Sequence, residues 1–403
     1  MNKSLKLYIL LPFLIICSVS CEDKKASITK ASVVENYGAI VYKSYKDCYD
    51  SSVIMQQQIN SFIENPSEAN LDLAKKAWLN ARNIYGQTEV YRECNGPIDT
   101  QNDTWGFGHE GRMNAWPIDE SYIDYVSIEN PDTTPFANSY KSIISDEAVA
   151  IDKETLSKLN ESKDDKSIST GWHAIEFLLW GQDNTLPNVD LAGQRKYTDY
   201  TEASANYKRR GQYLQVVTDL LVSDLKGLVK TWSPAGKYRK VFDALDTEVA
   251  LKQLLTGATF LAGDELSSER IIAPVNSTDG LNNSGQEDEQ SCFSDNTHND
   301  IWANAQGVYN VVFGKYDTIS GTSFFDLVKA ADGNQANILK EASDLVLQKV
   351  NVIKNNDKPF DYLITKENVS DTSFGPVMQT VEALKAWADV ISESASKIGV
   401  SIK

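Results

Sequence analysis

The chain has 403 residues, 41% hydrophobic and 10% aromatic, which is typical of a folded protein of about two domains. It carries 39 Lys and Arg residues against 56 Asp and Glu residues, so its formal net charge at pH 7 is −17. A surface of this sign repels a phosphate backbone, and no dense run of basic residues offsets it, so no nucleic-acid partner is expected. The composition also excludes collagen-like, fibrous and multi-span membrane proteins.

The first twenty residues have the features of a secretory signal peptide. Lys3 and Lys6 precede a short apolar run from Leu7 to Ile16, and small residues then lead to Cys21. The run is shorter than the roughly 20 residues that span a bilayer. A cysteine after a small residue is what lipoprotein processing requires, so we expect cleavage before Cys21 and lipid attachment to it. An ordinary secreted protein with an incidental cysteine is the alternative.

Residues 21–30 are expected to form a polar tether behind the lipidated cysteine. Membrane contact would then be made through the lipid anchor only, on the extracytoplasmic side. Of the five cysteines, Cys17 would leave with the signal peptide and Cys21 would carry lipid. The other three, Cys48, Cys94 and Cys292, are odd in number, which implies no complete disulfide framework.

The rest of the chain shows apolar residues at helical spacing rather than at the alternation of strands. Long helices are predicted from Val34 to Phe62 and over residues 71–91, 197–232, 241–266, 338–352 and 374–398. No run of alternating β-branched residues bounded by turns is found. We therefore predict an all-α fold.

An eight-residue pattern, W-x-N-A-x-x-x-Y, occurs at residues 78–85 and again at residues 302–309. Both copies lie on expected helices, so they are either traces of a duplication or similar core positions. We favour the duplication, which predicts two related helical bundles. These are an N-terminal bundle over residues 31–232 and a C-terminal bundle over residues 233–403, divided at the break around Pro234.

Three polar and aromatic stretches interrupt the helices, and loops of this kind are where chemistry is expected. They cover residues 87–120, residues 170–183, and residues 263–270 followed by 286–300, and they contain all three histidines of the chain, His109, His173 and His298. This concentration makes the histidines candidates for a single site.

His173 and Glu176 lie three residues apart, on one face of a helix expected to begin at Gly171. Their apolar neighbours, among them Trp172 and Phe177, would desolvate the imidazole and the carboxylate and shift their pKa values. The two residues are either ligands of a metal or a buried, mutually satisfied pair that fixes the helix start. The H-E-x-x-H pattern of zinc peptidases is absent, which disfavours a standard zincin mechanism.

The third stretch holds a further group of oxygen and nitrogen donors, of types that suit calcium, manganese or iron. The donors are Glu287, Asp288, Glu289, Asp295, His298 and Asp300. The stretch does not fit the calcium-loop template, and acidic runs are usually solvated. His298 is the candidate third metal ligand beside His173 and Glu176.

The segment Gly171–Gly181 resembles the imelysin-like family, in which G-x-H-x-x-E precedes an apolar run. Five further blocks resemble the iron-regulated protein A branch of that family, in matching order, at residues 87–92, 96–99, 114–119, 265–270 and 286–298. One position departs from the branch. Gln290 stands where a histidine is expected, so metal binding through that position would be weaker.

The resemblance implies a site at the cleft between two helical-bundle domains, with His173 and Glu176 at its core and Gly171 shaping the turn. Matched blocks add three residues with less defined roles, which are Asp119, Glu269 and Arg270. The candidate metal ions are iron, zinc and calcium.

The resemblance also implies a role in iron uptake at the bacterial cell envelope, either on the periplasmic side of the outer membrane or on the cell surface. The ligand would be iron or an iron-bearing molecule, delivered to an uptake partner in the envelope. A metal-dependent peptidase that uses the same His-x-x-Glu pair is the alternative, because the family carries a peptidase name. A non-enzymatic scaffold that binds a protein partner is a third hypothesis.

Overall fold

The computed structural model describes residues 28–100, 108–126, 141–371 and 375–402. Across these ranges the regular secondary structure is helical apart from one hairpin, in which β1 (Lys315–Tyr316) pairs antiparallel with β2 (Ile319–Ser320). The predicted all-α class is confirmed. The expected signal peptide and Cys21 lie outside the described residues. Within the described ranges, no helix combines the length and the apolar character needed to cross a membrane.

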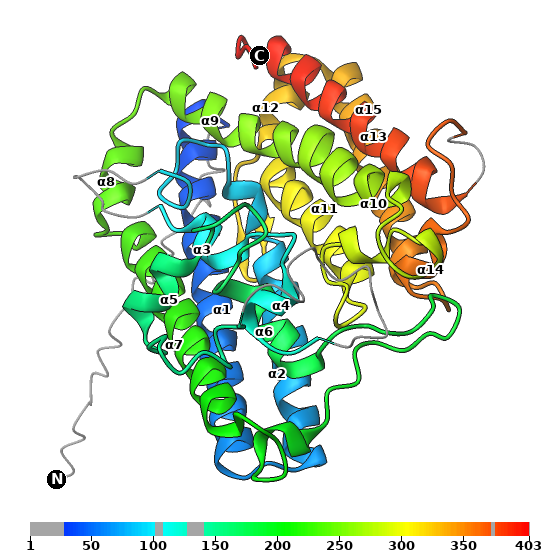
Figure 1. Cartoon of the computed structure of the whole chain (residues 1–403). Helices are drawn as coiled ribbons and strands as arrows, with labels where there is room; N and C mark the ends of the chain where they lie inside the picture. The colour runs from blue at the N-terminus through cyan, green and yellow to red at the C-terminus, as the bar shows by residue number, and fades with distance from the viewer. Residues whose placement is uncertain (1–27, 101–107, 127–140, 372–374, 403) are drawn as a thin grey trace, which may run out of the picture.

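A first group of helices consists of α1 (Lys30–Glu64), α2 (Glu68–Gly86), α6 (Gly171–Trp180) and α7 (Tyr207–Trp232). Both α1 and α6 pack against α2 and α7 (Figure 1). Thr29 begins α1 with a capping box, a local signal that satisfies the free N–H groups of the first turn. All ten residues of α6 are buried, which agrees with a helix that is apolar on every side.

A second group consists of α9 (Thr247–Phe260), η3 (Leu261–Ile272), α11 (Thr297–Phe313), α13 (Gly333–Lys354) and α15 (Pro376–Lys397). Helix α15 packs on α13, η3 and α9, and α11 packs on α13 and η3. Figure 1 shows α11, α13 and α15 together, in yellow to red, on the opposite side of the molecule from α7. The two groups meet where α2 contacts α11 and α1 contacts α9, and their buried apolar side chains form one continuous core.

Shorter elements connect the long helices: η1 (Glu89–Tyr91), α3 (Glu110–Asn114), α4 (Glu120–Ile123), α5 (Lys153–Leu159), η2 (Tyr197–Tyr200), α8 (Lys237–Asp243), α10 (Ala273–Asn276), η4 (Leu281–Asn283), η5 (Gln286–Asp288), α12 (Phe324–Ala331) and α14 (Phe360–Ile364). Among them, η1 contacts both α9 and α11, and α3 lies on α6. The predicted division of the chain at residue 233 stays a prediction, because α9 contacts helices of both groups.

Two expected helices differ from the observed ones. The helix predicted over residues 241–266 is broken, because Asp246 begins α9 by accepting a hydrogen bond from the backbone N of Glu248 at 2.9 Å. Directly after Phe260, α9 continues as η3, which is a π-helix. The polar stretch that begins at residue 263 is therefore helical at first rather than a loop. The helix predicted from residue 197 begins later, because Asn206 has a left-handed backbone with φ 59° before α7.

The two copies of the repeated pattern lie on α2 and α11, which pack against each other. Their environments differ, since Trp78 is buried and Trp302 half-buried, while Asn80 is exposed and Asn304 buried. Equivalent core positions after a duplication would have similar burial. The pattern therefore gives the duplication no structural support, and the duplication stays a prediction.

Candidate functional site

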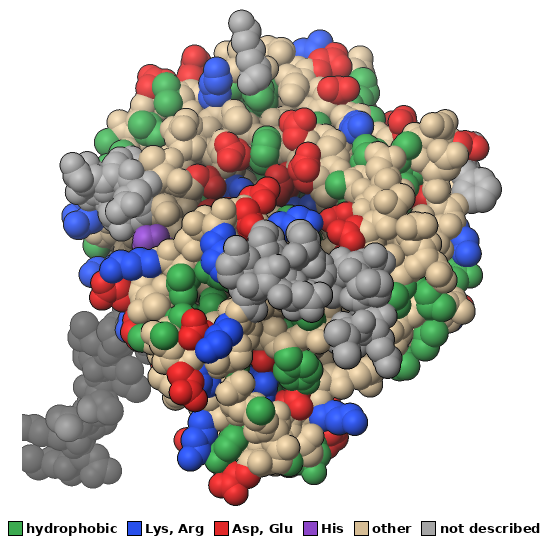
Figure 2. Space-filling model, in the orientation of Figure 1, with side chains coloured by type: hydrophobic (Ala, Val, Ile, Leu, Met, Phe, Trp, Pro, Cys, Tyr) green, Lys and Arg blue, Asp and Glu red, His purple; other side chains and the backbone are tan. Residues whose placement is uncertain are grey.

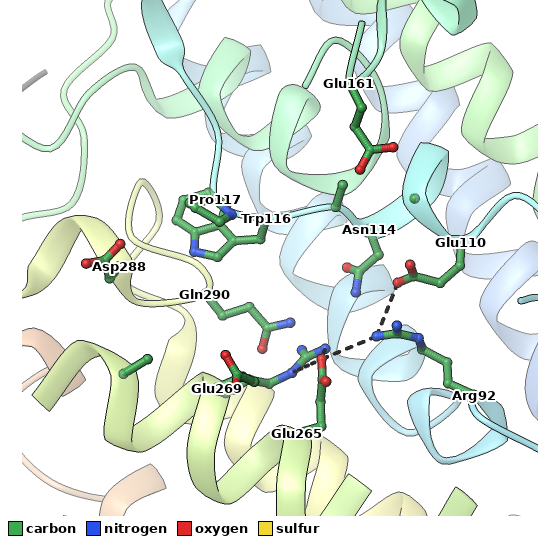
Figure 3. Close-up of a pocket in the computed structure, with 14 residues that line it drawn as sticks. Arg92, Glu110, Asn114, Trp116, Pro117, Glu161, Glu265, Glu269, Asp288 and Gln290 are labelled. Atoms are coloured by element: carbon green, nitrogen blue, oxygen red, sulfur yellow. Dashed lines mark hydrogen bonds and ion pairs between the residues drawn. The ribbon is translucent and has the colours of Figure 1, made fainter. Parts of the chain in front are cut away.

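A cavity of about 480 Å³ opens between α3 and η3. Its charged lining consists of Arg92, Glu110, Glu161, Glu265, Glu269, Arg270 and Asp288. Figure 2 shows acidic and basic side chains gathered across the middle of one face, and Figure 3 shows the lining residues converging from separate segments. Five carboxylates against two guanidinium groups make the lining acidic overall, so it offers oxygen donors to a cation and two positive groups to any anionic part of a complex.

The π-helical form of η3 determines how its charged residues face the cavity. In a π-helix residue i bonds to residue i+5, so Glu265 and Arg270 lie on one face. The Nη2 atom of Arg270 lies 2.8 Å from Oε1 of Glu265, and Nη1 of Arg92 lies 3.3 Å from the same oxygen (Figure 3). Although burial opposes ionisation, Arg270 and Arg92 hold the pKa of Glu265 below its usual range. One carboxylate therefore anchors both cationic side chains of the lining.

Glu110 contributes a second kind of carboxylate to the cavity. Its Oε1 lies 3.3 Å from Nη1 of Arg92 (Figure 3). Burial nevertheless raises the pKa of Glu110, and the attraction of Arg92 only partly offsets this effect. The cavity thus combines a strongly ionised acid, Glu265, with one that binds protons more readily.

A buried ionic network centred on Arg82 lies under the cavity. Arg82 is completely buried, and its Nε donates a hydrogen bond to Oδ1 of Asp300 at 2.9 Å. It also donates to the side chain of Asn114 and lies 3.8 Å from Glu89. Glu89 in turn pairs with Arg270 at 2.5 Å. The network links α2 to α11 and holds Arg270 at the cavity wall.

His173 and Glu176 meet on α6, with Nδ1 of the imidazole 2.9 Å from Oε2 of the carboxylate, and both are completely buried. The other carboxylate oxygen accepts hydrogen bonds from the backbone N and the hydroxyl of Ser294, at 3.0 and 2.7 Å. Burial lowers the pKa of His173, and Arg82 and Arg270 lower it further, which favours the neutral form of the imidazole. Burial raises the pKa of Glu176. Nε2 of His173 has no hydrogen-bond partner in the described part of the chain.

Trp116 separates this pair from the cavity. Its ring packs on the imidazole of His173, with centroids 4.7 Å apart, and the same residue lines the cavity. His173 and Glu176 are not among the lining residues, so they support the cavity wall from behind. Gly171 begins α6 with φ +89°, and a Cβ there would lie 2.4 Å from the carbonyl oxygen of Met113. Only glycine lets α6 begin so close to α3.

The predicted site residues therefore occupy different places. Glu269 and Arg270 line the cavity, whereas Gly171, His173 and Glu176 lie beneath it. Asp119 is buried and caps α4, accepting a hydrogen bond from the backbone N of Ser121 at 3.0 Å, and does not line the cavity.

His298, the predicted third metal ligand, is not brought to His173 and Glu176. Its Nε2 lies 2.9 Å from the side-chain amide of Asn299. Burial lowers its pKa, and Asp300 and Lys354 are among the charges that act on it. Within the described ranges, three side chains of metal-binding type converge at one place, Asp183, Asp295 and Asp361, and that group includes no histidine.

Several residues of the site were not identified from the sequence. Arg92, Glu110 and Glu265 lie in the stretches expected to carry chemistry, but no pattern distinguished them from neighbouring charges. Arg82 did carry a signal. It stands on the buried face of an amphipathic helix, between Trp78 and Tyr85, where an arginine needs a buried partner.

Comparisons with known proteins agree with the resemblance noted in the sequence. The family model described as Imelysin matches residues 41–389. A relative named Iron-regulated protein A, from Synechococcus elongatus, is 25% identical over 308 residues, which are 73% of this chain and 67% of that protein. A crystal structure of a protein provisionally named iron-regulated protein A precursor, from Parabacteroides distasonis, is similar in fold. It matches with a TM-score of 0.66 at 20% identity and covers 93% of this chain and 97% of that one. The chain belongs to the imelysin family.

Proposed function

We propose that the protein binds iron, as an ion or in a complex, in the cavity between α3 and η3, and serves iron uptake at the cell envelope. Membership of the imelysin family and the name of the Synechococcus relative support an iron-related role. The observation that carries the proposal is the acidic lining, in which Glu110, Glu265 and Glu269 offer oxygen donors. Carboxylate oxygens are hard ligands that suit ferric iron.

The two arginines extend the range of iron species that the cavity can accept. A guanidinium group forms paired hydrogen bonds with the carboxylates of an organic chelator. Arg92 and Arg270 both line the cavity and are held there by Glu265. Iron carried by a carboxylate chelator would therefore find partners for both the metal and the chelator.

His173 and Glu176 remain at the core of the proposed site as positioning residues. They hold Trp116 against the cavity and fix Ser294 through two hydrogen bonds. Direct contact with iron is proposed for Glu265 and Glu269 instead, since these side chains line the cavity.

Binding of ferric citrate to the purified full-length protein tests this proposal, with uptake measured by equilibrium dialysis of labelled iron. Glu269→Gln removes a cavity carboxylate that is exposed, so the variant is expected to fold and to bind iron at least tenfold more weakly. Asp264→Asn is the matched control, because Asp264 is also on η3 but lines a different pocket. Equal loss in both variants, or no saturable uptake by the parent, would contradict the proposal.

We also propose that Cys21 carries the lipid that holds the protein at the membrane. Its place after small residues and a short apolar run supports this assignment. Cells grown with labelled fatty acid should transfer label to the parent protein and not to Cys21→Ala. Equal labelling of the two proteins would contradict the assignment.

The geometry of the described residues does not favour the metal-dependent peptidase, although the family carries a peptidase name. A catalytic metal needs an open coordination position that substrate can reach. His173 and Glu176 have no exposed surface, and Trp116 lies between His173 and the cavity. A peptide in the cavity would contact the wall and not the pair.

A further inference from the structure

Three carboxylates converge outside the cavity. Asp183 follows α6, Asp295 precedes α11, and Asp361 lies on α14, yet one oxygen of each lies within 4.8 Å of the others. Oxygens that share one calcium ion at 2.3–2.6 Å are at most about 5 Å apart, so the spacing suits a common ion. Asp183 and Asp361 are only 5% and 3% exposed, so the group is not an ordinary solvated acidic patch.

No positive side chain neutralises this group within the described ranges. The charges that act most on Asp295 are the carboxylates of Asp183, Asp361 and Asp190. Lys358, a lysine beside the group, pairs with Asp190 at 3.6 Å rather than with one of the three. Hydrogen bonds from Thr185 and Gln286 satisfy Asp183. Burying the other carboxylates without a cationic partner is costly, and a bound cation would offset that cost.

Glu289 gives a second, independent indication of a missing ligand. It is 1% exposed, and its Oε2 has no hydrogen-bond partner in the part of the chain that the structure describes. Asp361, Asp295 and Asp183 all act on its charge, so Glu289 lies near the group, and it also has a side-chain hydrogen bond with Thr297. Oδ1 of Asp295 is likewise buried without a partner. Each unsatisfied buried oxygen needs an explanation, and an ion bound beside both of these oxygens would supply one.

We propose that Asp183, Asp295 and Asp361, with Glu289 beside them, bind a divalent cation that prefers oxygen ligands, of which Ca²⁺ fits best. Ca²⁺ accepts irregular sets of carboxylates and keeps water ligands, which lets Glu289 act through a water. The site is separate from the iron cavity and does not depend on the proposed function.

The ion would also brace the wall of the candidate cavity. Asp295 follows Ser294, whose backbone N and hydroxyl both bond to Glu176. Asp183 accepts a hydrogen bond from the side-chain amide of Gln286 at 3.1 Å, on the segment that continues to Gln290 at the cavity. Three chain segments that are distant in sequence are thereby joined at one point.

Calorimetric titration of chelator-treated, full-length protein with CaCl₂, MgCl₂ and MnCl₂ tests the site. We expect one ion per chain and a melting temperature that rises with the concentration of the binding cation. Asp295→Asn and Asp361→Asn should each weaken binding at least tenfold. Asp190→Asn is the matched control, because it removes a neighbouring charge that is already paired with Lys358, and it should bind within threefold of the parent.

Folding of the variants is checked without cation. Each Asn substitution removes a repelling buried charge, so the cation-free variants should melt no lower than the cation-free parent. The proposal is overturned if none of the three salts gives saturable binding at millimolar concentration. It is also overturned if folded Asp295→Asn and Asp361→Asn bind as tightly as Asp190→Asn.

Discussion

Substitution of Arg82 by Met tests the buried network beneath the cavity. Arg82 and Asp300 are both completely buried, and their Nε–Oδ1 distance is 2.9 Å. The change leaves Asp300 with the hydroxyl of Ser291 as its remaining side-chain donor among the described residues. Breaking a buried pair on one side costs about 3–5 kcal/mol, because the remaining charge stays buried without compensation. Glu89 is affected less, since Arg270 still pairs with it at 2.5 Å.

We therefore expect Arg82→Met to lower the free energy of unfolding by about 4 kcal/mol, or the melting temperature by about 5 °C in a chain of this length. Urea and thermal unfolding followed by circular dichroism measure the two quantities. The control is Lys340→Met, which breaks the exposed pair of Lys340 with Asp344. Exposed helix pairs of this spacing contribute only about 0.3–0.5 kcal/mol.

The double variant Arg82→Met with Asp300→Asn separates charge from packing. If an uncompensated Asp300 causes the loss, its neutralisation should restore at least half of the stability that Arg82→Met removes. An Arg82→Met protein within about 1 kcal/mol of the parent would refute the reasoning. So would a double variant that is less stable than Arg82→Met, because the losses would then come from shape rather than from charge.

Three further changes give predictions that follow from single contacts. Gly171→Ala should lower the free energy of unfolding by more than about 2 kcal/mol, measured by urea, because its Cβ would meet the carbonyl oxygen of Met113 at 2.4 Å in a left-handed backbone. Burial raises the pKa of Glu120 to about 7, so the folded protein holds a proton there that the unfolded chain releases, and stability falls as pH rises from about 4.5 to 7. Glu120→Gln should therefore be more stable than the parent at pH 8, by up to about 3 kcal/mol, and the gain should vanish at pH 4. Gln290→His adds an imidazole to the cavity lining and should tighten iron binding at least tenfold in the dialysis assay, whereas unchanged binding would show that position 290 does not contact the metal.

The long helices could be predicted from the sequence because each buries one regular apolar face. The residues from Val34 to Phe62 keep this spacing without interruption, and α1 contains them all. The second half of η3, beyond residue 266, could not be predicted, since its charged and hydroxyl residues have the composition of a loop. A polar helix and a polar loop differ only in what they face, and that depends on tertiary packing.

The candidate site was predictable only in part, for a related reason. Spacing along one helix fixes local pairs, so the contact between His173 and Glu176 could be inferred before the structure was known. The partner of Arg82 lies 218 residues away, and no local pattern encodes that distance. Asp361 belongs to a short helix outside the three polar stretches, so nothing in the sequence connects it to Asp183.

The buried position of the G-x-H-x-x-E residues suggests why polar groups occur in an otherwise apolar helix. A histidine and a glutamate without solvent contact cost several kcal/mol unless they satisfy each other and their neighbours. Glu176 accepts a hydrogen bond from the hydroxyl of Ser294. The imidazole of His173 packs against the ring of Trp116. Ser294 is adjacent to Asp295 of the carboxylate group, and Trp116 lines the acidic cavity. The pair thus joins the walls of two candidate ligand sites, and this joining role explains its burial better than direct catalysis, which would need solvent access.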